Sequence, residues 1–397
     1  MSLLDDIENR GEQQNARRTT KRHPDGWEPG AIFNGTEGVL TVQTSGSPVW
    51  DDLLREWGFD PSSVEVVEPV QFRTWDANMG GGETRRFVYY RATIRRRVDG
   101  RVELDALLAE VRKWKRVAQK EQSFDSCAAL VVPWADWQIG ADDAGGPKAT
   151  LARFTDSIGQ IQDRWRDLRK IGVPLGRLVV CGLGDLGESC QGFYSQQAFR
   201  AVLNNRDQRV LVRRMVVQAL KEWAPLAPEI TVAFVGGNHG EERINGQSYT
   251  DFGDNRDVAV LDDVAEILRE SDRFGHVRTL IPNRDLTLTL DLFGTIVGLA
   301  HGHQIGKASG SSPALKAQAW WKDQMKSMRP VGDADLLLTG HFHHLIVQSV
   351  GPRTHIQCPA LHGGSDWWDE IKGGGDRPGQ LSLVVDGDGW DHLKFHR

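Results

Sequence analysis

The chain of 397 residues contains only four cysteines, and no two of them form a C-x-x-C pair. This scarcity argues against a disulfide framework and against a thiolate metal site, and it indicates buried, reduced thiols. Cys127 and Cys181 lie in apolar runs, as buried thiols would. No apolar stretch approaches the roughly 18 residues that a membrane span requires. Residues 1–6 do not begin a secretory signal, so we expect a cytoplasmic protein that does not bind a membrane.

Two common catalytic motifs are also missing. The chain has no G-x-S-x-G segment for a serine nucleophile and no G-x-x-x-x-G-K-[ST] loop for ATP phosphates. Hydrophobic residues make up 39% of the chain and charged residues 26%, which is typical of an ordinary globular protein. The formal net charge of −6 argues against a uniformly basic nucleic-acid binder, although a local basic patch can still attract a polyanion.

The pattern of polar and apolar residues divides the chain into three parts. Residues 1–25 are polar and aperiodic and end in a basic stretch at 17–23, which predicts a disordered arm. Residues 26–122 predict a small α+β accessory domain. Residues 123–397 alternate strand-like and helix-like segments, which predicts an α/β layered domain.

The accessory domain combines helical and strand-like spacing. We expect helices at 49–57 and 104–114 and strands at 64–67, 70–73 and 86–97, with the last strand paired across the glycines at 80–82. The last strand is rich in cations and tyrosines, which could form either a nucleic-acid surface or a solvated outer face. These residues are Tyr89, Tyr90, Arg91, Arg95, Arg96 and Arg97.

Continuous apolar runs predict buried strands in the larger domain, and helical spacing predicts two long helices between them. The strands are expected at 127–132, 177–181, 230–235, 286–300 (two strands) and 336–339, and the helices at 151–171 and 196–223. Because the later strands follow one another closely, we expect antiparallel pairing in the second half of this domain.

Five short segments carry groups that could bind a metal, and most of them directly follow a predicted strand. They are Asp136-Trp137-Gln138, Gly184-Asp185-Leu186-Gly187-Glu188, Gly237-Asn238-His239, His301-Gly302-His303 and Gly340-His341-Phe342-His343. Asp, Asn, Gln and His together suit Mn²⁺, Fe or Zn²⁺. Their number suffices for two ions that share one carboxylate, the arrangement that clamps both oxygens of a phosphoryl transfer.

Each segment also has a structural alternative. Asp136 and Asp185 could cap a helix or a turn, and Asn238 could be a turn residue. The H-x-H pair at His341 and His343 is more specific, because residues two apart on a strand share one face. The order of all five segments favours a metal centre over five unrelated turns.

This order resembles the calcineurin-like metallophosphoesterase superfamily, whose pattern is D-x-H, G-D-x-x-D, G-N-H-D/E, H and G-H-x-H. The resemblance covers roughly residues 126–350 and implies a four-layer α/β/β/α sandwich, with two divalent ions at the strand ends. It implies Mn²⁺ as the preferred ion, with Fe or Zn²⁺ as alternatives.

The resemblance also implies roles for individual residues. One ion would be held by Asp136, Gln138, Asp185 and His343, and the other by Asp185, Asn238, His301 and His341. Asp185 would bridge the two ions. His239 would act on the scissile phosphate as a general acid or would stabilise the transition state.

The chain departs from the family pattern at three positions. Gln138 stands where His is usual, and its amide oxygen is a weaker, neutral ligand. Glu188 stands where Asp is usual and would orient a neighbouring histidine. Gly240 follows Asn238-His239, so the usual carboxylate is shifted to Glu241 and Glu242. Outside the metal ligands, His303 and Lys307 are expected to support the site or to contact substrate.

The reaction is therefore expected to be phosphodiester hydrolysis, with DNA as the leading substrate. Support for a nuclease comes from the basic arm, the arginine-rich strand and an insert between His303 and His341 that mixes cations with tryptophans. The insert contains Lys307, Ser309, Ser311, Lys316, Trp320, Trp321, Lys322 and Lys326. Trp320 and Trp321 could instead pack a helix onto the core, and Trp367-Trp368 poses the same choice.

Two other functions stay open. The first is a small-molecule phosphodiesterase or phosphatase that acts on a nucleotide or a nucleotide sugar, which the neutral Gln138 and the acidic net charge favour. The second is a non-catalytic binding module with a structural metal site. A homodimer is compatible with either function.

Overall fold

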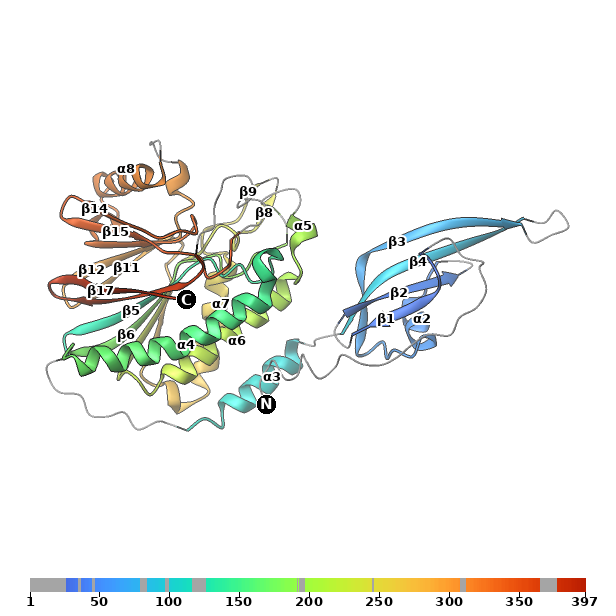
Figure 1. Ribbon diagram of the computed structural model, residues 1–397, viewed down its shortest axis with the longest axis horizontal. Coiled ribbons are helices and arrows are strands. Elements are labelled where there is room, and N and C mark those ends of the chain that lie inside the picture. Colours follow the sequence, from blue (N-terminus) through green and yellow to red (C-terminus); the bar gives the residue numbers. More distant parts are fainter. Residues whose placement is uncertain are drawn as a thin grey trace. The chain divides into compact units, whose positions relative to one another are not determined.

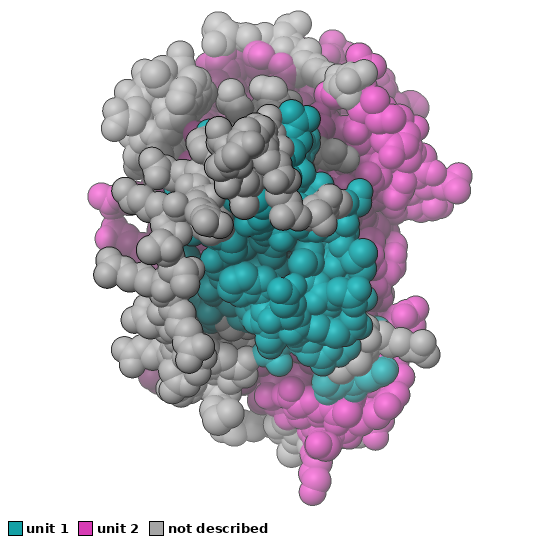
Figure 2. All heavy atoms as spheres, turned by 90° about the vertical axis from the view of Figure 1, so that its right-hand side faces the viewer, with its two compact units in different colours: residues 1–106 teal, residues 107–397 magenta. Residues whose placement is uncertain are grey.

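The computed structural model describes residues 26–34, 37–44, 47–78, 84–96, 100–115, 126–190, 192, 197–244, 246–307, 312–364 and 377–397. The chain forms two compact units, Met1–Ala106 and Leu107–Arg397 (Figures 1 and 2). The expected boundary at residues 122/123 lies outside the described residues, and the division between the units comes earlier. The arm at 1–25, the glycines at 80–82 and Arg97 also lie outside the described residues.

The described residues of the first unit contain an antiparallel sheet and the helix α2. Its elements are β1 (Gly30–Phe33), β2 (Glu37–Thr44), α2 (Trp50–Glu56), β3 (Val64–Asn78) and β4 (Thr84–Arg96), with the strand order β1-β2-β4-β3. The predicted helix and strands are confirmed, but 64–67 and 70–73 belong to one strand. Its register shifts between Val67 and Gln71, where Pro69 lacks the N–H that regular pairing needs. Leu40, Leu54 and Ile94 form part of its core.

The second unit contains a six-stranded sheet in the order β10-β7-β6-β5-β16-β17. Its strands are β5 (Ala128–Trp134), β6 (Leu175–Gly182), β7 (Glu229–Phe234), β10 (Val277–Leu280), β16 (Gln380–Asp386) and β17 (Gly389–His396). The four strands from β10 to β5 are parallel, and β16 pairs antiparallel with β5 and β17. Every residue of β5 is buried, as its continuous apolar sequence predicts for a strand covered on both faces.

A second, five-stranded sheet has the order β11-β12-β13-β15-β14. Its strands are β11 (Thr287–Leu292), β12 (Thr295–Ala300), β13 (Leu336–Thr339), β14 (Ile346–Val350) and β15 (Arg353–Gln357). The expectation of antiparallel pairing was wrong for its centre, because β12, β13 and β15 run parallel. The long connection through α8 (Pro313–Lys326) allows the chain to return in the same direction from β12 to β13. The remaining strands, β8 (Arg243–Ile244) and β9 (Gln247–Ser248), form a small hairpin.

The two sheets face each other, and helices cover their outer faces (Figure 1). Alternate residues of both sheets meet in one apolar cluster that includes Val131, Val179, Leu299, Leu338 and Leu383. Outside the larger sheet lie α4 (Gly146–Lys170), α6 (Asn205–Trp223) and α7 (Arg256–Arg269), and outside the smaller sheet lies α8. The four-layer α/β/β/α sandwich is thereby confirmed.

The described residues also contain several shorter helices. They are α3 (Gly100–Val111), α5 (Gln197–Arg200), η1 (Asp143–Gly145), η2 (Asp272–Phe274), η3 (Ile305–Lys307) and η4 (Pro330–Asp333). The single helix expected at 196–223 was wrong, because α5 and α6 are separate. The side chain of Asn204 accepts a hydrogen bond from the Asp207 backbone N–H, so Asn204 is the N-cap of α6 and a new helix begins after it.

Three expectations about single side chains are settled by burial. Cys181 is buried as expected, but Cys127, directly before β5, is exposed. Trp320 and Trp321 are 8% and 1% exposed and pack the amphipathic α8 onto the five-stranded sheet, so the structural alternative was right. Ser309, Ser311 and Trp367-Trp368 lie outside the described residues. Within the described ranges, no helix has the length and apolarity needed to cross a bilayer.

Candidate metal centre

The candidate ligands lie in loops after three parallel strands of the larger sheet and two parallel strands of the smaller sheet. Asp136 follows β5, Asp185 follows β6, Asn238 follows β7, His301 follows β12 and His341 follows β13. The carboxyl ends of parallel strands lie at the same edge of a sheet, so these loops can converge. Residues far apart in sequence are thereby brought within contact distance.

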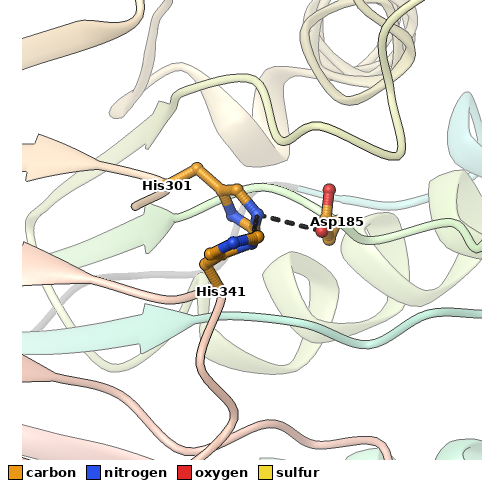
Figure 3. Close-up of side chains that lie close together, drawn as sticks. All are labelled: Asp185, His301 and His341. Carbon is orange, nitrogen blue, oxygen red and sulfur yellow. Dashed lines mark hydrogen bonds and ion pairs between the residues drawn. The ribbon is translucent and has the colours of Figure 1, made fainter. Parts of the chain in front are cut away.

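Three of these side chains form the centre of the site. His301 Nε2 lies 2.9 Å from Asp185 Oδ2 and 3.2 Å from His341 Nδ1. Figure 3 shows both imidazoles beside the Asp185 carboxylate, which approaches from the opposite sheet. Their ligand atoms all lie within 4.8 Å of one another, which is compatible with one shared ion.

Asn238 belongs to the same cluster. Its Oδ1 lies 2.9 Å from His301 Nε2, and the Nδ1 of His301 donates a hydrogen bond to the Leu183 carbonyl at 2.7 Å. In neutral His301 this bond places the only ring proton on Nδ1. Its Nε2 lone pair then faces the oxygens of Asp185 and Asn238 with no hydrogen between them. These electron-rich atoms repel one another, and a cation bound among them would remove the repulsion.

Asp136 and His343 form a neighbouring pair. Asp136 Oδ2 accepts the backbone N–H of His341 at 2.9 Å, and its Oδ1 lies 3.5 Å from His343 Nε2. Asp136 is fully buried, and its Oδ1 forms no hydrogen bond with a described residue. A buried carboxylate oxygen without a donor is strongly disfavoured, so this oxygen too is suited to a metal ion. Gln138 is attached to this region through its backbone N–H, which donates to the Asp185 carbonyl at 2.9 Å.

The backbone at the candidate ligands is unusual. Asp136, Gln138, Asp185, His341 and His343 have φ values of 51°, 40°, 54°, 74° and 63°. Residues with side chains rarely adopt this left-handed conformation, which costs about 1–3 kcal/mol each and clusters at functional sites. Five such residues in three loops indicate that the surrounding fold imposes this geometry.

Two glycines allow the loops to approach the carboxylates. A Cβ on Gly340 would lie 2.6 Å from Asp136 Oδ2, and a Cβ on Gly237 would overlap the Asp185 carboxylate and backbone nitrogen. Neither of these two glycines has a positive φ, so they provide space rather than left-handed turns.

Charges in the site shift the pKa values in opposite directions. Burial alone would lower the pKa of His301, but the Asp185 carboxylate raises it to about 9 in the metal-free protein. Burial and the charge of His301 lower the pKa of His341 to about 3. Burial would raise the pKa of Asp185, but His301 and His239 hold it below its usual range. Without metal, a proton on His301 thus supplies the positive charge that the carboxylates require.

His239 lies beside the cluster and is oriented by Glu188. Its Nδ1 donates to the Glu188 carbonyl at 2.7 Å and lies 3.3 Å from the Glu188 carboxylate. Its Nε2 lies 4.0 Å from Asp185 Oδ2. Burial would lower the pKa of His239, but Asp185 and Glu188 raise it to about 10 in the metal-free protein. The ring is therefore held with Nε2 on the side of the Asp185 carboxylate.

The acidic residues that follow His239 have other partners. Glu241 binds Arg243 at 2.6 Å and lies 3.4 Å from His303 Nε2, and Glu242 binds Arg256 at 2.6 Å. His303 is close to the metal ligands, with its ring centroid 5.5 Å from that of His301. Lys307 lies in η3.

Asp257, at the start of α7, belongs to none of the five motifs. It is 2% exposed and accepts backbone N–H groups from two of the ligand loops. Burial, followed by the charge of Asp185, raises the pKa of Asp257 to about 6. The only sequence signal was the Asn255-Arg256-Asp257 helix start, which is common to many helices that have no such role.

The four-layer fold and the converging motifs agree with the resemblance to the calcineurin-like metallophosphoesterases. No protein-family model matches the chain, and no curated protein matches it.

Several solved structures are similar to the chain. A single mutant of Vps29 from Entamoeba histolytica has 17% identity over 68% of this chain and 99% of its own, with a TM-score of 0.30. A predicted phosphoesterase from Streptococcus pneumoniae has 12% identity over 65% of this chain and 84% of its own, with a TM-score of 0.28. An archaeal phosphodiesterase has 12% identity over 67% of this chain and 99% of its own, with a TM-score of 0.28. At such low values these likenesses support no functional conclusion.

Proposed function

We propose that the chain is a divalent-metal-dependent phosphoester hydrolase. The observation that carries this proposal is the convergence of Asp185, His301 and His341 from three strand ends, within 4.8 Å of one another. Oxygen and imidazole ligands of this kind suit Mn²⁺, Fe or Zn²⁺. A buried, partly strained cluster of this composition has no evident structural purpose without a cation.

The residues present would hold two ions that share Asp185. Asn238, His301 and His341 would complete one site, and Asp136, Gln138 and His343 the other. When bound, such ions supply a hydroxide at neutral pH and neutralise charge on the phosphoryl oxygens. We propose Mn²⁺ as the first ion to test.

His239 is proposed as the group that acts on the leaving oxygen. Glu188 binds its Nδ1 side, and its Nε2 lies 4.0 Å from Asp185 Oδ2, on the side of the proposed ions, so Nε2 is the atom that would carry a proton to substrate. A proton held at this atom by the nearby carboxylates can be passed to the oxygen that leaves phosphorus.

A generic chromogenic phosphodiester, bis(p-nitrophenyl) phosphate, tests the reaction class. We expect Mn²⁺-dependent hydrolysis by the wild type and none after replacement of the shared ligand, Asp185→Asn. Metal analysis of the same two proteins should give two ions per wild-type chain and fewer in the variant. A wild type that binds no divalent ion would sink the proposal. Metal binding without hydrolysis would favour the non-catalytic module.

Within this function, a nucleic-acid strand is the proposed substrate. Phe72 is 68% exposed on β3, with its ring centroid 6.3 Å from that of Tyr90, and Arg73 beside it is also exposed. Exposed aromatics next to cations suit stacked bases and phosphates. Other expected support is weaker, because Arg95 is paired with Glu65 and Arg91 lies over Trp27.

The alternative substrate is a nucleotide-sized phosphodiester. The net charge of −6 and the neutral Gln138 favour it over a polyanion. Cleavage of single- and double-stranded DNA by wild type and by His239→Ala separates the two. Good activity on small phosphodiesters with none on either DNA would reject the nuclease. DNA cleavage that is lost in both His239→Ala and Asp185→Asn would support it.

A further inference from the structure

One buried carboxylate, Asp257, is bound to two of the loops that deliver ligands to the proposed metal centre. Its Oδ2 accepts the backbone N–H of Asp185 and of Gly237, each at 2.9 Å. Its Oδ1 accepts the backbone N–H of Leu186 at 3.0 Å. Gly237 directly precedes the ligand Asn238, so the three bonds span the β6 and β7 loops.

The start of α7 holds Asp257 in place. The Asn255 side chain accepts the Asp257 backbone N–H at 3.0 Å and donates from Nδ2 to the Gly237 carbonyl at 2.8 Å. The Gly240 carbonyl accepts the backbone N–H of Arg256 at 2.9 Å. The first turn of the helix is therefore bound to the β7 loop by side chain and backbone alike.

Gly240 makes this docking feasible. A Cβ at Gly240 would lie 2.9 Å from Asp257 Oδ2 and would overlap the Asn255 side chain. The family pattern places a carboxylate residue at this position, directly after Asn238-His239. In this chain the position is Gly240, which has no side chain, and the carboxylate of Asp257 lies beside it.

We propose that Asp257 is a positioning residue for the metal centre and replaces the carboxylate that the family pattern has after Asn238-His239. The inference rests on the proposed metal-dependent function. Charge-assisted hydrogen bonds that backbone N–H groups donate to a carboxylate are about twice as strong as neutral ones. Here they hold Asp185 at its left-handed φ of 54° and fix the separation between Asp185 and Asn238. Asp257 itself need not touch metal or substrate.

The variant Asp257→Asn tests the inference. Asparagine keeps the size of the side chain, but it replaces one acceptor oxygen with an NH₂ donor that opposes a backbone donor. We expect the Mn²⁺ dissociation constant, measured by calorimetry, to rise about 10–100-fold, as is typical when an outer partner of a metal ligand is lost. Saturating Mn²⁺ should restore a large part of kcat.

A matched control separates positioning from general destabilisation. Val264→Ala removes two methyl groups from a fully buried side chain of the same helix, seven residues after Asp257. It should lower the unfolding temperature of the metal-free protein and leave the Mn²⁺ dissociation constant within about twofold of wild type. If it weakens Mn²⁺ binding as much as Asp257→Asn does, positioning by Asp257 is rejected.

Asn255→Ser provides a second variant in case Asp257→Asn does not fold. Serine still caps α7, but it lacks the Nδ2 amide group that donates to the Gly237 carbonyl. It should weaken Mn²⁺ binding to a smaller degree, and an unchanged dissociation constant in either folded variant would overturn the inference. If the wild type binds no metal, the proposed function is overturned together with the inference. If the wild type binds Mn²⁺ and hydrolyses substrate, and the variants bind Mn²⁺ as tightly as it does, only the inference is overturned.

Discussion

Glu188 binds the Nδ1 side of His239 twice, through its backbone carbonyl at 2.7 Å and through its carboxylate at 3.3 Å. The side chain of Gln197 donates to the same Glu188 carbonyl at 2.8 Å, so the backbone that orients the histidine is itself held. The longer arm of glutamate, compared with the aspartate of the family pattern, still reaches the imidazole.

Because Glu188 orients His239, we predict that the loss of kcat in His239→Gln depends on the leaving group of the substrate. With a nucleoside or alkyl leaving group we expect kcat to fall about 10²–10⁴-fold, because an alkoxide leaves poorly without a proton. With p-nitrophenolate, which leaves readily unprotonated, the loss should be much smaller. Steady-state kinetics on both substrates measures the difference. Equal losses would argue against proton donation by His239.

The lack of space at Gly237 predicts a severe effect of Gly237→Ala. The added methyl group would overlap the Asp185 carboxylate and its backbone nitrogen, so the β6 and β7 loops must separate. We expect loss of metal binding together with reduced stability, measured by calorimetry and thermal unfolding. Gly159→Ala is the control, because it lies in α4 with open space around it and should stabilise by about 0.5–1 kcal/mol. Normal metal binding by Gly237→Ala would contradict the close approach of the loops.

The burial of Trp321 predicts a role in stability rather than in stacking on bases. Its indole Nε1 donates to the Val331 carbonyl at 2.8 Å, and its side chain lies in the α8 core. Trp321→Ala should lower the free energy of unfolding by about 3–5 kcal/mol. Lys322→Ala, at the exposed neighbouring position, should change it by less than about 0.5 kcal/mol. If DNA affinity fell in a folded Trp321 variant without loss of stability, the stacking hypothesis would regain support.

Buried His355 predicts acid sensitivity. Its ring nitrogens lie 2.8 Å from Thr339 Oγ1 and 2.8 Å from Gln348 Nε2, and burial lowers its pKa to about 4. The unfolded chain binds a proton at this histidine near pH 6.5, whereas the folded chain does not. Its contribution to stability is therefore complete above about pH 6.5 and is lost as the pH falls towards 4.

This contribution is on the order of 3 kcal/mol over that interval. His362 and His396, whose pKa values burial also lowers to about 4, act in the same direction. Urea unfolding between pH 4.5 and 7 in the presence of a chelator should show a steep loss of stability in wild type and a shallower one in His355→Gln. Parallel pH profiles for the two proteins would show that His355 does not contribute.

Much of the architecture was predictable from local patterns. Continuous apolar runs such as β5 identified strands covered on both faces, and the polar residues directly after them identified the candidate ligands. Helical spacing identified α4, although it did not reveal that Asn204 separates α5 from α6. Spacing alone also could not give strand direction, because direction depends on how the chain crosses between β12 and β13.

Ligand chemistry is a property of side-chain type and motif order, so the amino-acid pattern alone indicated which residues could bind a metal. Which of these residues meet, and what holds them in place, depends on the three-dimensional packing. Asp257 belongs to a helix far along the chain from Asp185, and its role depends on where that helix begins in space. The sequence likewise left two roles open for Trp320 and Trp321, base stacking and packing in the core, and the position of α8 shows that they pack in the core. Burial and long-range contacts are properties of the whole fold, and no short segment contains them.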